Sequence, residues 1–485
     1  MRKGFIICLF TFLMLIGGMA FGSSKGFAAE VAINKKNFPG KSFREYVRTE
    51  IDNNRDGILS EAEILATKEI FAGVEEDEKG VSDYKGIEYF SNLERLEILG
   101  YDEIESIRTV DVMLDVSRNV KLKQLICQAL ELRQLNLSGL TELEEVKIRA
   151  DLCPSLDLSK SSKLKDLEIL SLRGLSGDRS DCVTLGDMPV LGNLSISGLT
   201  KVEGDFRQMP ALRNVILSVS ETSGMEMDLS GNRNLKTVYC SNVKDIPSIQ
   251  LQDCPNLEEV ILSEIGVQTV NVHNCPKVNK LAVSQAPGTR CLRIIGGEDI
   301  TWLAVSGKTI PQLDIKELVN LQTLNLGGNI KKIILHNAQE IKGLAIEGGK
   351  KFDFSSYTGL ENLSVTNMKM KQLDLSKHDK LKSIKCYDMK KLEKLRLCKN
   401  ATYSKVIIKK TKVRRLDVRK VRVEKLIYAD NKAKQLLIRG NRTLQKLDCR
   451  NNQLPKLDLR GCRGLKKENL LYTGNKKLKK RMIKK

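Results

Sequence analysis

Residues 444–465 read LQKLDCRNNQLPKLDLRGCRGL, and this stretch carries two short apolar patterns in succession. Leu444, Leu447 and Cys449 give L-x-x-L-x-C, and Leu457 and Leu459 give L-x-L. In an extended strand alternate side chains point to the same face, so each L-x-[apolar] pair predicts a short strand with one buried face. The chain returns to the same position after about 21 residues, a period typical of repeat architectures.

The same pattern recurs through most of the chain. Its central apolar position occurs about 17 times, and after Leu125 the steps are 19 to 23 residues except for one of 27 before Leu194. These positions are Leu96, Leu125, Val146, Leu167, Leu194, Val215, Val238, Val260, Leu281, Leu303, Leu324, Leu344, Leu363, Ile384, Val406, Leu426 and Leu447. One such unit is too small to bury its own apolar face, whereas stacked units bury a continuous core. The sequence therefore predicts a repeat solenoid over residues 86–470, with about 17 turns and a length of about 80 Å at the usual strand spacing.

The unit at 444–465 resembles the bacterial leucine-rich repeat of the nested 21-residue class, whose consensus is LxxLxCxxNxLxxLDLSxNxx. Asn452 stands in the asparagine place of that consensus, and LQTLNLGGN at 321–329 puts Asn329 there. Other turns lack this asparagine, as at Leu130 and Met389. The resemblance implies a leucine-rich-repeat solenoid of the β-rich α/β class. Exported proteins of Gram-positive bacteria with one calcium loop ahead of their repeats resemble the whole layout.

Residues 52–63, DNNRDGILSEAE, match the EF-hand calcium-loop pattern D-x-[DN]-x-[DN]-G-x5-E at every specified place. Ca²⁺ takes about six to eight oxygens, which alternate side chains and one backbone carbonyl supply, and the glycine permits a sharp turn. The predicted ligands are Asp52, Asn54, Asp56, Ile58 through its carbonyl, Ser60 and Glu63. An acidic helix start that matches by chance is the alternative.

Apolar residues at helical spacing flank this loop. Those before it are Phe43, Tyr46, Val47 and Ile51, and those after it are Ile64, Leu65 and Ile70. Calcium loops usually work in pairs, and the sequence contains only one. We therefore expect residues 30–85 to form an EF-hand-like helix-loop-helix, with calcium as its cofactor, that caps the first turn of the solenoid.

Residues 1–29 have the features of a secretory signal peptide. A basic pair at 2–3 precedes an apolar run at 4–21, and small residues follow at 28–29. An uncleaved anchor is the alternative, because the apolar run approaches the length that spans a membrane. We expect a secreted protein that is free or held at the cell surface, of a Gram-positive type bacterium.

Of the 12 cysteines, 11 follow this segment, and in an exported chain that number suggests disulfides. Their spacing indicates otherwise. Cys127, Cys240, Cys386 and Cys449 each close an L-x-x-L-x-C-like unit, and Cys254 and Cys275 are 21 residues apart. At such repeat positions Cys acts as a small buried apolar residue, so we predict free thiols, with disulfides as the alternative.

Positive charge is concentrated at the C-terminal end. Residues 31–110 contain 11 Lys or Arg and 18 Asp or Glu, a net charge of −7, whereas residues 351–485 contain 40 and 12, a net charge of +28. Basic residues on the repeats, and in a predicted basic tail at 471–485, could attach the protein to an anionic cell-wall polymer or membrane surface. They are Lys405, Lys425, Lys446, Arg450, Lys476, Lys477, Lys479, Lys480 and Arg481. A merely solvated face is the alternative.

The residues beside each apolar pair are expected to face outward. At the position after the pair, six successive turns carry Ser197, Ser218, Ser241, Ser263, Ser284 and Ser306. Serine at a strand end can simply satisfy the adjoining turn. The functional interpretation is a neutral groove at about residues 195–306, because exposed aromatic residues often anchor interfaces. The candidate ligand contacts are Tyr239, Trp302, Ile216 and Ile261.

The sequence contains no nucleophile-elbow, zincin or Walker motif, and its three histidines stand in unrelated turns. We therefore expect a monomeric binding protein and not an enzyme, one that binds calcium and recognises an unknown protein or glycan. An electrostatically anchored structural cell-surface protein without a specific ligand is the alternative. An enzyme-associated module fits less well, because dockerins carry two calcium segments. Export and the single Trp disfavour nucleic acid as a partner.

Overall fold

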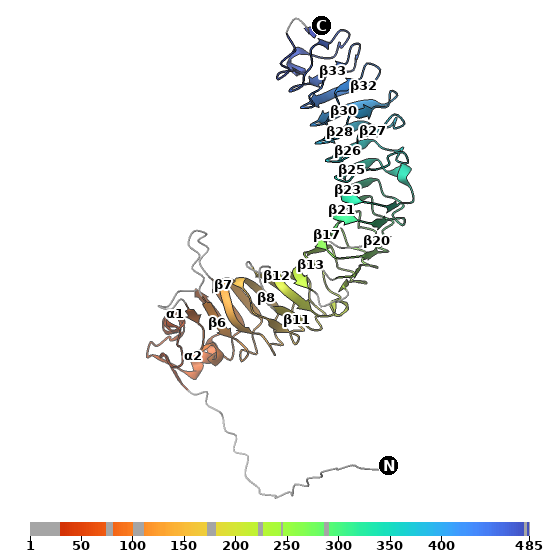
Figure 1. Ribbon diagram of the computed structural model, residues 1–485. Helices are drawn as coiled ribbons and strands as arrows, with labels where there is room; N and C mark the ends of the chain where they lie inside the picture. Colours follow the sequence, from red (N-terminus) through yellow and green to blue (C-terminus); the bar gives the residue numbers. More distant parts are fainter. Residues whose placement is uncertain are drawn as a thin grey trace, which may run out of the picture.

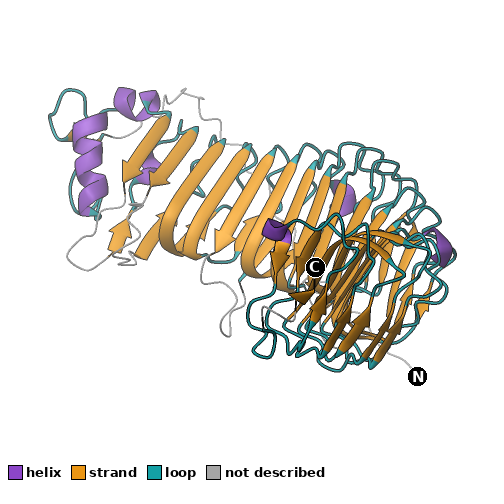
Figure 2. Ribbon diagram, turned by 90° about the horizontal axis from the view of Figure 1, so that it is seen from above, coloured by secondary structure: helices purple, strands orange, loops and turns teal. Residues whose placement is uncertain are grey.

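The computed structural model describes residues 30–73, 81–99, 111–171, 181–221, 227–243, 246–285, 291–479 and 483–484. The chain coils into a long curved solenoid, with a small helical cap at its N-terminal end (Figure 1). Seen from above, the main strands lie side by side in one row that runs away from the cap (Figure 2). The predicted signal peptide, Lys480 and Arg481 lie outside the described residues.

One parallel ladder runs along the inner side of the curve (Figure 1). Each of its strands pairs in parallel with the next. The strands are β3 (Glu69–Gly73), β5 (Arg95–Leu99), β7 (Gln124–Asn136), β8 (Glu145–Leu152), β10 (Asp166–Ser171), β12 (Asn193–Glu203), β13 (Asn214–Glu221), β15 (Thr237–Ser241), β17 (Glu259–Ile265), β19 (Lys280–Gln285), β21 (Trp302–Ile310), β23 (Thr323–Ile330), β25 (Gly343–Glu347), β26 (Asn362–Thr366), β28 (Ser383–Tyr387), β30 (Thr402–Lys409), β32 (Arg422–Ala429), β34 (Lys446–Asp448) and β36 (Leu470–Leu471). Every predicted central position lies in one of these strands, so the predicted leucine-rich-repeat solenoid is confirmed.

Shorter strands cover the opposite side of the coil. A six-stranded sheet there has the order β14-β16-β18-β20-β22-β24, and three two-stranded sheets follow it. The long strands β7 and β12 reach this side as well, where they pair with short strands. The short strands are β4 (Val81–Asp83), β6 (Asp111–Asp115), β9 (Leu156–Leu158), β11 (Cys182–Leu185), β14 (Met227–Asp228), β16 (Ser248–Gln250), β18 (Thr269–Val272), β20 (Cys291–Gly296), β22 (Gln312–Asp314), β24 (Ile333–Ile334), β27 (Gln372–Asp374), β29 (Lys394–Arg396), β31 (Arg415–Asp417), β33 (Gln435–Leu437), β35 (Leu457–Asp458) and β37 (Ile483–Lys484).

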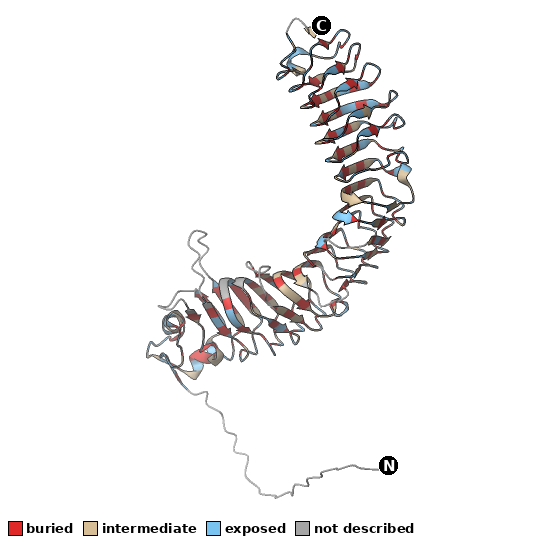
Figure 3. Ribbon diagram, in the orientation of Figure 1, coloured by how far each residue is buried: buried red, intermediate tan, exposed pale blue. Residues whose placement is uncertain are grey.

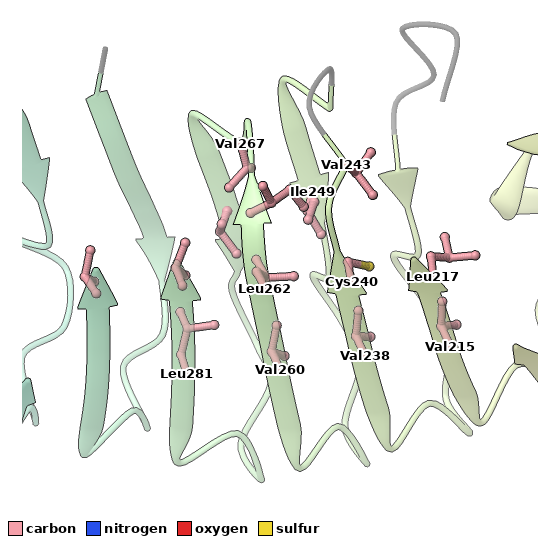
Figure 4. Close-up of a cluster of buried hydrophobic side chains, with 14 of the residues drawn as sticks. Val215, Leu217, Val238, Cys240, Val243, Ile249, Val260, Leu262, Val267 and Leu281 are labelled. Carbon is pink, nitrogen blue, oxygen red and sulfur yellow. The ribbon is translucent and has the colours of Figure 1, made fainter. Parts of the chain in front are cut away.

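The core is a continuous apolar column between the two sides. Figure 4 shows part of it, where Val215, Val238 and Val260 stack on neighbouring strands and Cys240 lies among them. All four side chains are buried. Buried positions alternate with more exposed ones along the main strands, as the two-residue repeat of a strand requires (Figure 3).

Asparagines close several turns near the C-terminal end. The buried Asn452 donates its amide to the Tyr428 carbonyl at 2.6 Å and accepts the backbone N–H of Asn431 at 3.0 Å. Asn431 and Asn475 make the same kind of contacts on neighbouring turns. Met389 stands at a turn without this asparagine, and there its sulfur accepts the backbone N–H of Met368 instead. Buried turn carbonyls and amides are thereby satisfied, as burial requires.

The prediction for Asn329 is wrong. This residue lies half-buried inside β23, opposite Thr309 of the neighbouring strand, and not at a closed turn. The strand register shifts between Gly307 and Thr309, and Gly328 with a φ of 85° bends the chain there. Because the strand continues to Ile330, Asn329 is held away from the asparagine position.

The cap consists of two short helices around the predicted loop. Helix α1 (Lys41–Tyr46) continues into a π-helical turn, η1 (Val47–Ile51), and helix α2 (Glu61–Ala66) follows the loop. The second helix is shorter than predicted, and Ile70 belongs to β3, where it starts the ladder before residue 86. Four single-turn 3-10 helices lie elsewhere: η2 (Ile87–Tyr89), η3 (Phe206–Gln208), η4 (Ala338–Glu340) and η5 (Lys467–Asn469).

The segment predicted as a basic tail takes part in the fold. Ile483 lies opposite Leu457 in a parallel pair, and the amide oxygen of the buried Asn475 accepts the Leu454 N–H at 3.1 Å. These contacts pair the edges of the last described turn with the turn before it. Among the described residues, no helix is long and apolar enough to cross a membrane.

The cysteines after residue 30 are all free in the structure, which confirms the prediction of unpaired thiols. Cys127, Cys240, Cys386 and Cys449 are buried in the strand core. Another group lies at the turns of the opposite side, where each thiol donates to a carbonyl of the preceding turn. These contacts are Cys254 to Leu229, Cys275 to Leu251 and Cys462 to Ile438.

Candidate functional site

The predicted calcium loop has the backbone of a tight turn held by its own side chains. A carboxylate oxygen of Asp52 accepts the N–H of Gly57 at 2.9 Å, and Asp56 accepts the N–H of Ile58 at 2.8 Å. Gly57 has a φ of 80°, and a Cβ there would meet no atom within 4 Å. The glycine is therefore required by the backbone conformation and not by lack of space.

The last predicted ligand, Glu63, lies in the first turn of helix α2 and holds the loop closed. Its two carboxylate oxygens accept the N–H of Asn53 at 2.8 Å and the N–H of Ser60 at 2.9 Å. The Ser60 hydroxyl accepts the N–H of Glu63 in return, which completes a capping box. Burial alone would raise the pKa of Glu63, but these hydrogen bonds outweigh it, and the pKa lies below its usual range.

The donor set fits a hard cation. Asp52 is 1% exposed, and among the described residues its second oxygen, Oδ1, is buried without a hydrogen-bond partner. A buried carboxylate oxygen without a partner is costly, and a cation would satisfy it. Oε1 of Glu63 also keeps a free lone pair beside the Asn53 N–H that it accepts, whereas Oε2 accepts both the N–H and the hydroxyl of Ser60.

The ligand set is not fully assembled in this conformation. In the described part of the chain, no three His, Cys, Asp or Glu side chains converge closely enough to hold a metal ion. Asn54 and Asp56 instead bond to each other, with the amide donating at 2.9 Å. Calcium binding therefore requires the loop carboxylates to draw together, with Asn54, Ser60 and the Ile58 carbonyl completing the set.

A short N-terminal strand occupies the place where a second calcium loop would pair. Strand β1 (Val31–Ala32) runs antiparallel to β2 (Ile58–Leu59), which is the strand segment of the loop itself. Val31 lies opposite Leu59, and Ile33 donates its N–H to the Gly57 carbonyl at 2.9 Å. This pairing could not be predicted from the sequence, because a two-residue strand has no periodicity.

Aromatic residues join the cap to the first turns of the solenoid. Phe43 of α1 packs against Tyr84 with ring centroids 5.3 Å apart, and the Tyr46 hydroxyl accepts the N–H of Phe71 in β3 at 3.1 Å. A Cβ on Gly40 would lie 2.0 Å from the Asp83 carbonyl oxygen, so the chain approaches strand β4 very closely there. The loop is thus fixed to the end of the ladder.

The second candidate site is the outward face of the main sheet, on the concave side of the solenoid. The predicted serine row exists as pairs of neighbours: Ser197 with Ser218, Ser218 with Ser241, Ser241 with Ser263, and Ser284 with Ser306. Between Ser263 and Ser284 the register shifts, and Glu264 takes a φ of 51°. The row is therefore interrupted at one point.

A shallow hollow of about 410 Å³ lies on this face between Ile261 and Lys385. Its lining is mainly small and neutral, which is why the sheet is hollowed here. The outward-facing lining residues are Ile261, Ser263, Ala282, Ser284, Ala304, Ser306, Asn325, Gly327, Ala345, Glu347, Ser364, Thr366 and Lys385. We call this surface the trough. It extends farther toward the C-terminus than the predicted groove, although the run of small residues was visible in the sequence.

Of the predicted ligand contacts, only Ile261 lines the trough. Trp302 is the first residue of β21, where it lies between Lys280 and Thr323 of the two neighbouring strands. Tyr239 donates its hydroxyl to Glu259 on the next strand, and this hydrogen bond raises the pKa of the phenol. Ile216 lies two strands farther from the trough than Ile261 and is 40% exposed. Ile216, Tyr239 and Ile261 are nevertheless direct neighbours on adjacent strands, so the structure brings three of the four predicted contacts together and leaves Trp302 apart from them.

The predicted basic residues have different surroundings. Lys405, Lys425 and Lys446 lie in register on neighbouring strands of the concave face. Arg450 is engaged by Asp448, with contacts of 2.8 and 2.9 Å, so its charge is largely compensated. Lys476, Lys477 and Lys479 are exposed on the last turn.

The three histidines do not converge. His273 contacts Glu298 at 3.2 Å on the surface, whereas the buried His378 contacts the Phe354 carbonyl at 3.0 Å. His336 lies exposed on another turn. Among the described residues, the surroundings of these histidines contain no grouping of an acid, a base and a nucleophile.

No family model matches the chain, and no curated protein matches it. Among solved structures, the functional domain of InlJ from Listeria monocytogenes, described as including a cysteine ladder, is similar at 17% identity and a TM-score of 0.37. That likeness covers 88% of this chain and 77% of the other. A leucine-rich-repeat protein of Leptospira interrogans is similar at 15% identity and a TM-score of 0.34, covering 72% of this chain and 83% of the other. These likenesses are too distant to assign a partner or a ligand to this chain.

Proposed function

We propose that this protein is an exported, calcium-binding leucine-rich-repeat protein that recognises a protein or glycan through its concave face. The observation that carries the proposal is the trough, where three successive strands present Ala282, Ala304 and Asn325 beside Ser284, Ser306 and Gly327. Small outward side chains leave the floor open, and hydroxyl and amide groups along it can bond to a ligand.

The calcium loop supports this role indirectly. Its unpartnered Asp52 Oδ1 and its position at the end of the ladder favour a structural ion that fixes the cap. In a solenoid each turn is stabilised by its neighbours, so the end turn gains most from a cap. The ion would thus preserve the shape of the concave face and would not itself meet the ligand.

A substitution in the trough tests the proposal. Ala304→Arg places a long cation over the floor without entering the core, because Ala304 is half-exposed and points outward. The matched control is Gln312→Arg in β22, on the opposite side of the coil. Glycan arrays, and pull-downs from cell-wall material and host-cell extracts, should show a partner that the control retains and Ala304→Arg loses. If both variants capture the same partners as the unmodified protein, the trough is not the recognition surface.

An electrostatic anchor without a specific ligand is the second candidate. It is favoured by the net charge of +28 on residues 351–485, against −7 on residues 31–110. In that case binding would follow the total charge, and no single surface would matter. Such binding would fall steeply with salt, because exposed charges are screened beyond about 8 Å at physiological ionic strength.

A further inference from the structure

Several charged residues that face each other on neighbouring turns of this solenoid carry opposite charges. Lys123 bonds to Glu94 at 2.6 Å, Lys165 to Glu144 at 2.6 Å, and Lys382 to Glu361 at 2.7 Å, each pair joining adjacent turns. Such pairing removes the repulsion that like charges on adjacent strands would cause.

Lys405, Lys425 and Lys446 depart from this arrangement. They are direct neighbours on β30, β32 and β34, about 4.8 Å apart at the usual strand spacing. Within the part of the chain that the structure describes, none of the three takes part in an ion pair. Like charges directly opposite each other destabilise a sheet, so this column, which we call the lysine ladder, is maintained against a cost in stability.

The surface beside the lysine ladder is apolar and then basic again. Ile407 and Ile427 face outward next to it and are half-buried. In the same row, Lys385 lies opposite Ile407 and Asp448 lies opposite Ile427. Lys385 and Lys410 lie over the Tyr387 ring at 5.8 and 5.2 Å. The concave face here is a strip in which two isoleucines lie between the lysine ladder and these two lysines, and Asp448, which bonds to Arg450, ends the isoleucine row.

The backbone at Lys410 is also in a conformation that is unfavourable for a lysine. Lys410 has a φ of 55°, a left-handed conformation that Asn and Asp tolerate better than Lys. On the adjoining turns Asp388 and Asp430 hold the equivalent position, with φ values of 52° and 59°. At this strained position the chain has a lysine where the adjoining turns have an aspartate. The strip therefore carries a positive charge here in place of a negative one.

We infer that this strip binds an acidic polysaccharide laid along the axis of the solenoid. The inference rests on the proposed role of the concave face in recognition and names a ligand class for its C-terminal part. A polyuronate carries a carboxylate on each sugar and has apolar ring faces, which match the lysine ladder and the isoleucine floor. Its carboxylates would supply the negative charge that the chain does not place opposite Lys405, Lys425 and Lys446.

Other polyanions fit the strip less well. A planar bilayer would touch the rims of the curve before it reached lysines on the concave side (Figure 1). In an extended acidic peptide, side chains on one face recur about every 6.6 Å, whereas the lysine ladder repeats at about 4.8 Å. A folded acidic protein would need pockets for anchoring side chains, and the trough ends at Lys385, where the strip begins.

The test compares two triple variants of the full-length protein with equal net charge. In the ladder variant, Lys405, Lys425 and Lys446 are changed to Gln. In the control, Lys412, Lys434 and Lys456, which are exposed beside β31, β33 and β35 on the opposite side, are changed to Gln. Binding to polygalacturonate is measured by calorimetry at two salt concentrations, with poly-L-glutamate and phosphatidylglycerol vesicles as competing probes.

We expect the ladder variant to bind polygalacturonate about threefold to a hundredfold more weakly than the control, since it loses three exposed charge pairs with the polymer. Equal weakening in both variants would show attraction to net charge alone and would overturn the inference. Tighter binding of poly-L-glutamate or of vesicles would assign the strip to an acidic peptide or a lipid surface instead. Either result leaves the trough untouched, and Ala304→Arg, which spares the lysine ladder, tests that surface separately.

Discussion

Val31 lies directly opposite Leu59 in an antiparallel pair, and both side chains are buried. Leu59 belongs to the strand segment of the predicted calcium loop, which in paired EF-hands meets a second loop. Here a segment at the start of the described chain takes that place, so a single loop has a partner of a different kind. The position and conformation of the loop are therefore coupled to residues 31–33.

Calcium should stabilise the cap. At a concentration of 100 times its dissociation constant, the ion adds about 2.7 kcal/mol to whatever part of the fold binds it. We expect calcium to raise the melting temperature of the N-terminal transition and to leave the rest of the solenoid unchanged. Thermal unfolding with Ca²⁺ and with chelator measures this. Glu63→Gln should lose the response, whereas Glu61→Gln in the same helix should keep it. A wild-type protein that ignores calcium would show that the loop binds none.

The β1 pairing should transmit calcium binding to the N-terminal segment. In Val31→Asp, a charge would replace a buried side chain opposite Leu59, and the strand pair should open. We expect calcium affinity to fall several-fold, because the loop then loses the strand that positions it. The control Glu30→Gln changes a neighbouring exposed residue. Calcium titration by calorimetry compares the two, and equal affinities would show that β1 does not support the loop.

Asn452 should contribute more to the free energy of unfolding than a surface residue does. Its side chain bonds to the Tyr428 carbonyl and to the N–H groups of Asn431 and Ala433. Asn452→Ala leaves these buried groups unpaired, which costs about 1–3 kcal/mol for each unsatisfied group. Hydrogen exchange of the turns around residues 431–475 should accelerate strongly. Gln453→Ala, at the exposed neighbouring position, should change exchange little.

The buried thiols should make the protein less stable at high pH. Burial raises the pKa of both Cys240 and Cys386 to about 12, whereas an unfolded cysteine ionises near pH 8.5. The folded state thus favours the protonated thiol, and this contribution is complete below about pH 8.5 and is lost as the pH rises toward 12. Urea unfolding from pH 7.5 to 10.5 measures the loss. Cys240→Ala should show a smaller decline than the unmodified protein.

Thiol counting gives an independent check on the same cysteines. All 11 cysteines after residue 30 are free in the structure. An unreduced sample of the protein should therefore show slow alkylation while folded and full reaction of these thiols after unfolding. Peptide mapping that found paired cysteines would contradict this expectation.

The sequence alone determined the fold class, because the repeat can be seen in the types of residue that recur. Apolar residues such as Val215, Val238 and Val260 recur at nearly constant spacing, and only a stacked coil can bury all of them. The buried position of Cys240 and the asparagine turn at Asn452 followed from the same register. The calcium-loop pattern could also be predicted, because the proposed ligands are close in the chain and such an ion requires a fixed spacing.

The tertiary structure decided which residues share a surface. The sequence could not show that Val31 pairs with Leu59, that Ile70 starts the ladder, or that Asn329 stays in its strand. Each depends on contacts between segments whose local pattern is short or ambiguous. The trough and the lysine ladder also required the structure, since one-residue shifts such as that after Leu262 decide which side chains lie next to each other. Residue spacing sets the period of a solenoid, whereas strand register across its turns sets its surfaces.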